Sequence, residues 1–199
     1  MIYISIIPED NAPEDVKKMY AKSKESMGYI PNYTKAFSHR PKIMEAWNNL
    51  IASIRGNMDL RRYELVTLAA ARALKSSYCM LAHGSVLRKK FYSPEQLNSI
   101  ARDYHKADLT PAEVAMMSFA EKIIKNATAV AQNDIEELRN HGFTDAEIFD
   151  ITTTATARCF FSKTLDALGT EPDEIYLELE EKLRNTLTVG RPIGGQNID

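Results

Sequence analysis

Apolar side chains recur at helical spacing along most of the chain. Between Pro41 and Gly56 they follow an i, i+3, i+4 pattern, which includes Met44, Trp47 and Ile51. No segment keeps the two-residue alternation of a strand and then ends in a hairpin turn. The pattern therefore predicts an all-α fold, a helical bundle.

Polar and proline residues mark where several helices begin. Ser93, Thr110 and Thr144 are each followed three residues later by Gln or Glu, which is the spacing of a capping box. Asp59 is a further N-cap candidate, ahead of a segment that is apolar nearly all round. These signals predict helix starts at four places, and the apolar segment after Asp59 is expected to be buried.

The end of the chain is expected to differ from the rest. Pro172 can restart a last helix, which would run through Leu177, Leu179 and Leu183. The tail from about residue 188 to residue 199 is rich in glycine and proline, so we expect it to be irregular and mobile unless a partner subunit orders it.

Composition narrows the class of protein. The 199 residues are 44% hydrophobic and 26% charged, and no linker or repeat divides them, so one domain over residues 1–199 is expected. The net charge is −2 and no basic cluster is present, so neither nucleic acid nor a membrane is expected as a partner. The first residues lack the charged start of a signal peptide, and the two cysteines fit a reducing compartment. A cytoplasmic location is therefore expected.

Glu64 is the exception within the apolar segment that follows Asp59. A buried carboxylate without a partner is costly, so Glu64 is expected to pair with another group. His83 is the candidate, either directly or through a water molecule. The alternative is an amphipathic helix with one Glu reaching to solvent.

Cys79 and His83 are four residues apart, so in a helix both side chains lie on one face. If Ser76 or Ser77 caps this helix, Cys79 falls in its first turn. There the unpaired backbone amides and the positive end of the helix dipole favour the thiolate, which is a nucleophile. The alternatives are a buried core thiol and a structural histidine.

The second cysteine, Cys159, lies mid-helix beside Phe160 and Phe161. A free cysteine in such surroundings behaves as a small hydrophobic residue, so a core thiol is expected. The alternative is a displaced resolving partner for Cys79, which requires Cα atoms closer than about 7 Å.

No metal or cofactor is expected. The other histidines lack a second ligand at a recognised metal-binding spacing. They are His39, His105 and His141.

The spacing of four of these residues matches a known signature at every position but one. Glu64, Ser76, Cys79 and His83 resemble the signature E-x(11)-C-x(2)-C-x(3)-H of AhpD-like alkylhydroperoxidases, within the carboxymuconolactone decarboxylase family. Ser76 stands where the signature has the first cysteine.

The resemblance extends over roughly residues 1–185. The segments Met27–Asn32 and Asp166–Asp173 are similar to the uncharacterised peroxidase-related branch of the family.

The resemblance implies an antioxidant, thiol-dependent peroxidase. Glu64, Cys79 and His83 would form a proton relay, and Ser76 would occupy the position of the resolving cysteine. The implied substrate is a small hydroperoxide, the implied reductant is a thiol or a lipoyl-type group, and the implied assembly is a homo-oligomer, either a trimer or a hexamer.

Ser76 limits this interpretation, because a serine cannot form the disulfide that completes a dithiol cycle. A natural single-cysteine protein that uses an external thiol and a Cys-to-Ser substitution both fit the sequence.

Two other functions stay open. A carboxymuconolactone decarboxylase-type enzyme would use Glu64 and His83 as acid-base groups on a small carboxylated lactone, with Cys79 incidental. A non-catalytic scaffold or binding protein would keep the fold after losing the dithiol chemistry.

Overall fold

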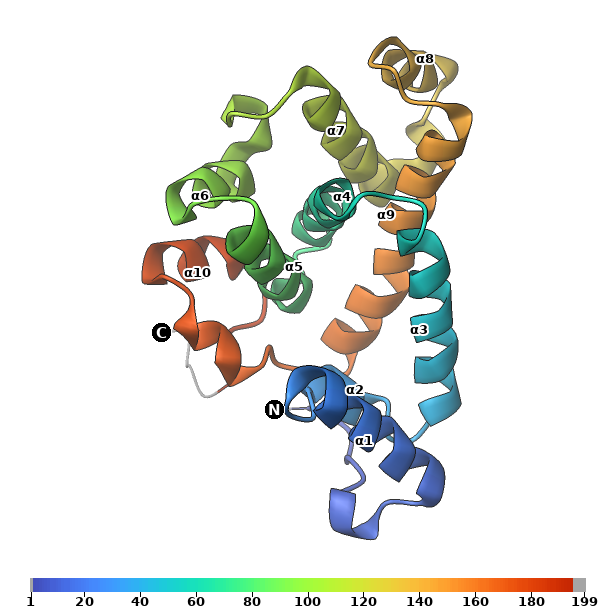
Figure 1. Ribbon diagram of the computed structural model, residues 1–199, viewed down its shortest axis with the longest axis vertical. Helices are drawn as coiled ribbons and strands as arrows, with labels where there is room; N and C mark the ends of the chain where they lie inside the picture. Colours follow the sequence, from blue (N-terminus) through green and yellow to red (C-terminus); the bar gives the residue numbers. More distant parts are fainter. Residues whose placement is uncertain (1, 195–199) are drawn as a thin grey trace.

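The computed structural model describes residues 2–194, and within them the chain is built from helices without a β-strand (Figure 1). The all-α prediction is confirmed. The α-helices are α1 (Glu14–Met27), α2 (Asn32–Ala36), α3 (Pro41–Arg55), α4 (Leu60–Ala73), α5 (Ser77–Lys90), α6 (Pro94–Asp103), α7 (Pro111–Asn126), α8 (Gln132–Asn140), α9 (Asp145–Ala167) and α10 (Glu181–Leu187). Short 3₁₀ helices are η1 (Glu9–Asn11), η2 (Tyr104–Lys106), η3 (Ala127–Ala129) and η4 (Glu174–Glu178).

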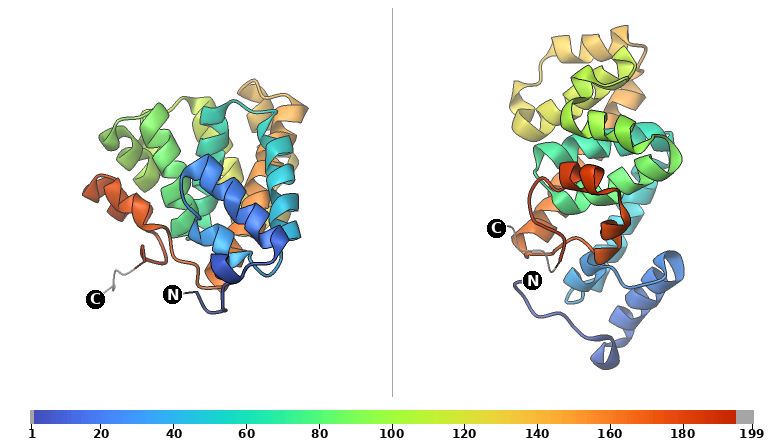
Figure 2. Two further views of the ribbon diagram at one scale, coloured as in Figure 1. Left: turned by 60° about the horizontal axis from the view of Figure 1, so that its bottom comes forward. Right: turned by 90° about the vertical axis from the view of Figure 1, so that its left-hand side faces the viewer.

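Helix α4 lies at the centre of the bundle, packed against α5, α7 and α9 (Figure 1). Every residue from Tyr63 to Ala71 is buried, as the apolar pattern predicts. The helix begins where expected, because the Asp59 carboxylate accepts a hydrogen bond from the Arg62 backbone N–H at 3.0 Å. Helices α1 and α2 form one end of the molecule and α8 lies at the other (Figure 2).

The predicted capping boxes are confirmed. Ser93, Thr110 and Thr144 are the N-caps of α6, α7 and α9, and each side chain accepts a hydrogen bond from the backbone of the third helical residue. The helix predicted to start at Pro41 is α3. Among the described residues, no helix is long and apolar enough to cross a membrane.

The prediction of one continuous last helix is wrong. The chain after Pro172 forms η4 and then α10, because Leu179 and Glu180 between them are extended. Nη1 of Arg184 donates to the carbonyl oxygens of Leu177 and Leu179, at 2.9 and 3.1 Å. The break is stable because a side chain satisfies carbonyls that a continuous helix would pair with its own backbone.

Residues 188–194 are irregular, as predicted, but they are held against the bundle. The Gly190 N–H donates to Ser77 Oγ at 2.8 Å, Nη2 of Arg191 donates to the Asp166 carbonyl at 3.1 Å, and Ile193 is buried. The expectation that this part needs a partner subunit to order it is therefore wrong. Residues 195–199 of the predicted tail lie outside the described residues.

Candidate functional site

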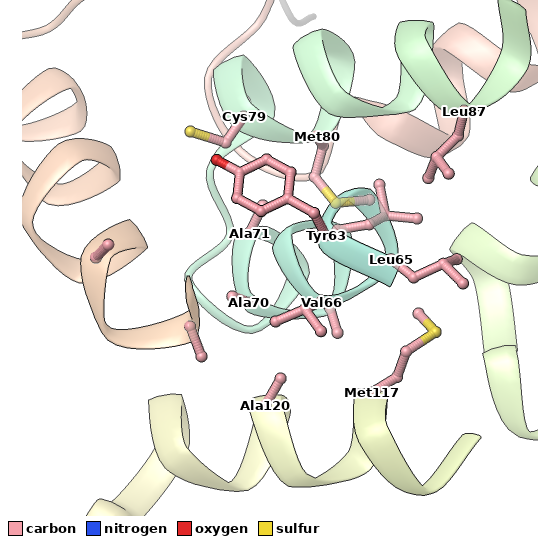
Figure 3. Close-up of a cluster of buried hydrophobic side chains, with 14 of the residues drawn as sticks. Tyr63, Leu65, Val66, Ala70, Ala71, Cys79, Met80, Leu87, Met117 and Ala120 are labelled. Carbon is pink, nitrogen blue, oxygen red and sulfur yellow. The ribbon is translucent and has the colours of Figure 1, made fainter. Parts of the chain in front are cut away.

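The site begins at the sharp turn between α4 and α5. Lys75 has a left-handed backbone, with φ of 56°, and Ser76 follows as the N-cap of α5. Cys79 therefore lies in the first turn, as predicted, although the Ser76 side chain makes no capping hydrogen bond. Figure 3 shows Cys79 at the start of α5, above the buried side chains of α4 such as Tyr63. Only 2% of Cys79 is exposed.

Glu64 and His83 form a direct pair, so the predicted contact is confirmed. Glu64 Oε2 lies 2.5 Å from His83 Nδ1. The Glu64 side chain is 4% exposed, and the His83 side chain is 17% exposed. The Glu64 carboxylate is thus buried, and the His83 imidazole is the more exposed member of the pair.

A third residue extends this pair. Nη1 of Arg158, on α9, lies 3.1 Å from His83 Nε2. A guanidinium has only donors and stays protonated, so Nε2 must be the acceptor and carries no proton. His83 then holds its proton at Nδ1 and donates it to Glu64. The three residues form one buried chain of carboxylate, imidazole and guanidinium.

The thiol has a different partner. Ser162 Oγ, one turn after Arg158 on α9, donates to Cys79 Sγ at 3.0 Å. Cys79 and His83 share no hydrogen bond among those that the described residues make. The structure thus brings the implied relay residues to one region but connects Cys79 to Ser162 and His83 to Glu64 and Arg158.

Ser76 faces α9 as well. It is fully buried, and its hydroxyl has no hydrogen-bond partner among the described residues. Ser76 lies close enough to Asp166, on α9, to affect the pKa of that carboxyl. Burial raises the pKa of the Asp166 carboxyl, whereas the Ser76 hydroxyl and the Arg191 guanidinium oppose that rise.

One face of α9 therefore lines the whole site. Arg158, Ser162 and Asp166 follow at intervals of four residues, and they meet His83, Cys79 and Ser76 in turn. The reversed order of these partners shows that α9 runs antiparallel to the start of α5.

The three residues of α9, Arg158, Ser162 and Asp166, were not predicted from the sequence. A signal was present, because Arg158 is the only charged residue between Asp150 and Lys163 and Ser162 follows it by one turn. The pattern indicates that the charged Arg158 lies on a buried face of its helix, but it does not indicate which other helix packs against that face.

The core position predicted for Cys159 is wrong. Both cysteines are free, and Cys159 is only partly buried. Its neighbour Arg158 and the later Ser162 take the inward positions of α9, so Cys159 falls beside the buried face.

Metal binding finds no support in the described part of the chain. No group of three or more His, Cys, Asp or Glu side chains there could hold a metal ion.

The geometry defines a class of site: a buried thiol at a helix N-terminus with a hydroxyl donor, beside a carboxylate–imidazole–guanidinium chain, within an all-α bundle. Residues 41–122, which hold Glu64, Ser76, Cys79 and His83, match the carboxymuconolactone decarboxylase family. That segment belongs to this family, and the resemblance to its AhpD-like branch is confirmed.

Solved structures share the fold over most of the chain. An uncharacterised peroxidase-related protein from Ralstonia eutropha JMP134, described as an alkylhydroperoxidase AhpD core, is 26% identical with a TM-score of 0.79; the match covers 88% of this chain and 94% of that one. An uncharacterised peroxidase-related protein from Silicibacter sp. TM1040 is 24% identical with a TM-score of 0.80, over 89% and 94% of the two chains.

A more distant match is the structure of a debrominase. The debrominase Bmp8 is 14% identical with a TM-score of 0.71, over 93% of this chain and 96% of that one. At this identity the likeness shows the fold alone. No curated protein shows significant sequence similarity to this chain.

Proposed function

We propose that this protein is a thiol-dependent peroxidase in which Cys79 reduces a small hydroperoxide. The observation that carries the proposal is the hydrogen bond from Ser162 Oγ to Cys79 Sγ, at 3.0 Å, in the first turn of α5. A hydroxyl donor and a helix N-terminus both favour negative charge on sulfur. The peroxidase-related name of the relative that is 26% identical agrees with this chemistry.

The cycle needs an external thiol. The Cys79 thiolate attacks the terminal oxygen of ROOH, the O–O bond breaks, and Cys79 sulfenic acid and RO⁻ result. A proton from water converts RO⁻ to ROH. An external thiol then displaces water to form a mixed disulfide, and a second thiol releases Cys79 as the thiol and leaves as an external disulfide. Ser76 cannot replace the first of these two thiols.

Installing the missing cysteine tests the proposal. Ser76 is the N-cap of α5 and Cys79 is its third residue. This i, i+3 separation suits the Cα distance of about 4.4–6.8 Å that a disulfide requires. We expect Ser76→Cys to lose two free thiols per chain on mild oxidation and to turn over peroxide with a dithiol reductant.

Two double variants show whether Cys79 or Cys159 is needed for turnover. Ser76→Cys combined with Cys79→Ser should not turn over, whereas Ser76→Cys combined with Cys159→Ser should. If Ser76→Cys does not oxidise, positions 76 and 79 are not juxtaposed and the non-catalytic scaffold is the better account.

A second candidate function is acid-base catalysis by Glu64 and His83. The chain from Glu64 through His83 to Arg158 does not include Cys79, which favours an acid-base enzyme acting on a small carboxylated lactone. Cys79→Ser separates the two candidates, because it abolishes peroxide reduction and leaves lactone decarboxylation intact.

We propose a cytoplasmic homo-oligomer, a trimer or a hexamer. Large apolar side chains on α3 and α9 support assembly, since Leu50, Phe149 and Phe160 are 50%, 66% and 46% exposed. Sedimentation equilibrium should give three or six times the chain mass of 22.5 kDa, and a monomer over the micromolar range would contradict the assembly.

A further inference from the structure

Arg158 is a buried cation without an anionic partner in direct contact. It is 3% exposed, and none of the described carboxylates lies within salt-bridge distance of it. Its guanidinium lies over the Trp47 ring, 4.8 Å from the centroid, and its Nε has no hydrogen-bond partner among the described residues. Buried polar groups without partners are rare and call for a functional explanation.

Arg158 and Cys79 approach the site from facing helices. Arg158 lies one turn from Ser162 on α9, and His83 lies one turn from Cys79 on α5. The two contacts between these helices, Arg158 with His83 and Ser162 with Cys79, are therefore adjacent. The guanidinium therefore lies on the turn of this interface next to the one that holds the sulfur.

We propose that α9 supplies two donors that the signature of the family does not contain: Ser162 for the sulfur of Cys79, and Arg158 for the oxygen that leaves the hydroperoxide. This inference rests on the proposed peroxidase function. Ser162 is a catalytic residue because it touches the reacting sulfur, and Arg158 becomes one when the substrate is bound.

The chemistry requires such a donor. When the Cys79 thiolate attacks ROOH, the S–OH bond forms, the O–O bond breaks, and both bonding electrons leave with RO⁻. Sulfur is oxidised and the peroxide is reduced. The guanidinium gives up no proton, so it stabilises RO⁻ by hydrogen bonding and charge until water protonates it. His83, with its proton at Nδ1, anchors the guanidinium through Nε2.

Two reagents distinguish the role of Ser162 from that of Arg158. Iodoacetamide reacts with the thiolate and releases iodide, whereas tert-butyl hydroperoxide releases an alkoxide. Ser162→Ala should slow both reactions by a similar factor, about 10-fold or more, because it acts on the thiolate. Arg158→Met should slow the peroxide reaction about 10²-fold and the alkylation much less, because it acts on the leaving oxygen.

A matched control is available on the same helix. The Thr154 hydroxyl is buried and lies 3.2 Å from a sulfur atom, Met58 Sδ, outside the site. Thr154→Val should lower Tm without changing either rate constant. All rate constants are measured by mass spectrometry at Cys79, in the full-length protein.

Arg158→Lys covers the case in which Arg158→Met does not fold. Lysine keeps the charge but loses the planar fork of donors. Arg158→Lys should lower the rate constant of Cys79 oxidation more with tert-butyl hydroperoxide than with peracetic acid, because peracetic acid releases the less basic acetate. An equal penalty with both oxidants overturns the role of Arg158.

The remaining outcomes are distinct. If Arg158→Met slows iodoacetamide and peroxide equally, Arg158 acts only on the thiolate, and the assignment is wrong while the proposed function stands. If Cys79 of the unaltered protein reacts with iodoacetamide but not with peroxide, the proposed function fails and the inference fails with it.

Discussion

Glu64 and Arg158 are buried polar residues, and each is hydrogen-bonded to His83. The pairing of Glu64 with His83 could be anticipated, because a carboxylate in an apolar helix needs a partner and the family-like spacing supplies one. Arg158 and Ser162 could not be assigned partners, because their contacts join segments about 80 residues apart in the chain. Local patterns indicate that a residue is buried, whereas its partner depends on how the helices pack.

Glu64→Gln and His83→Ala should each slow the peroxide reaction of Cys79 by about 10²-fold. The first substitution removes the negative charge that balances Arg158, and the second removes the acceptor that holds its guanidinium. Stopped-flow measurement with excess peroxide gives the rate constants, and calorimetry gives Tm. His105→Ala, on η2, is the control. Unchanged rate constants in both variants would show that this chain of residues is structural only.

Asp166 should make stability depend on pH in a specific direction. Burial raises its pKa above the usual 3.8, so the folded protein keeps this proton longer than the unfolded chain. The resulting stabilisation is complete below the unfolded pKa and is lost as the pH rises through the folded pKa. Asp166→Asn stays neutral, so its Tm relative to the unaltered protein should rise as the pH increases above the usual Asp pKa of 3.8. A difference in Tm that is constant with pH would contradict the shift.

The starts of the helices were easier to predict than the breaks and connections between them. Capping boxes and proline predicted where α3, α6, α7 and α9 begin, because those signals act within one turn. The break between η4 and α10 was missed, since the contacts of Arg184 that stabilise it depend on the folded chain. The irregular conformation of residues 188–194 was likewise predicted from their composition. Their packing against the start of α5 was not predicted, because it is a tertiary contact.

Gly190→Ala should detach this segment from α5. An added Cβ would lie 2.1 Å from the Lys75 carbonyl oxygen, and backbone cannot give way as a flexible side chain can. We expect a loss of about 1–3 kcal/mol in the free energy of unfolding, measured in urea. Alkylation of Cys79 should become faster, because the segment donates to Ser77 at the same helix end.

Gly194→Ala is the matched control within that segment. Its added Cβ would lie 3.2 Å from Glu171 Oε2, a side-chain atom at a longer distance than the Lys75 carbonyl oxygen is from the Cβ at position 190. If the two substitutions have equal effects, the close approach of Gly190 to the Lys75 carbonyl oxygen is not the cause of the loss of stability.

At the scale of the whole molecule, the all-α class followed from the apolar periodicity because nearly every helix presents one buried face to α4 or its neighbours. The site is a property of the assembled bundle. Glu64 comes from α4, Cys79 and His83 from α5, and Arg158 from α9. Three helices must pack before the thiol has its donor and the imidazole has both of its partners.

Identifying which cysteine forms a sulfenic acid tests whether Cys79 is the peroxide-reducing thiol. The full-length protein is treated with one equivalent of hydroperoxide, the sulfenic acid is trapped with a dimedone-type reagent, and the modified residue is found by mass spectrometry. Accessibility alone favours Cys159, which is partly buried, over Cys79, which is 2% exposed. We expect the adduct at Cys79, because its helix N-terminus and the Ser162 hydroxyl favour the thiolate. An adduct that forms first at Cys159, or none at Cys79, would contradict this expectation.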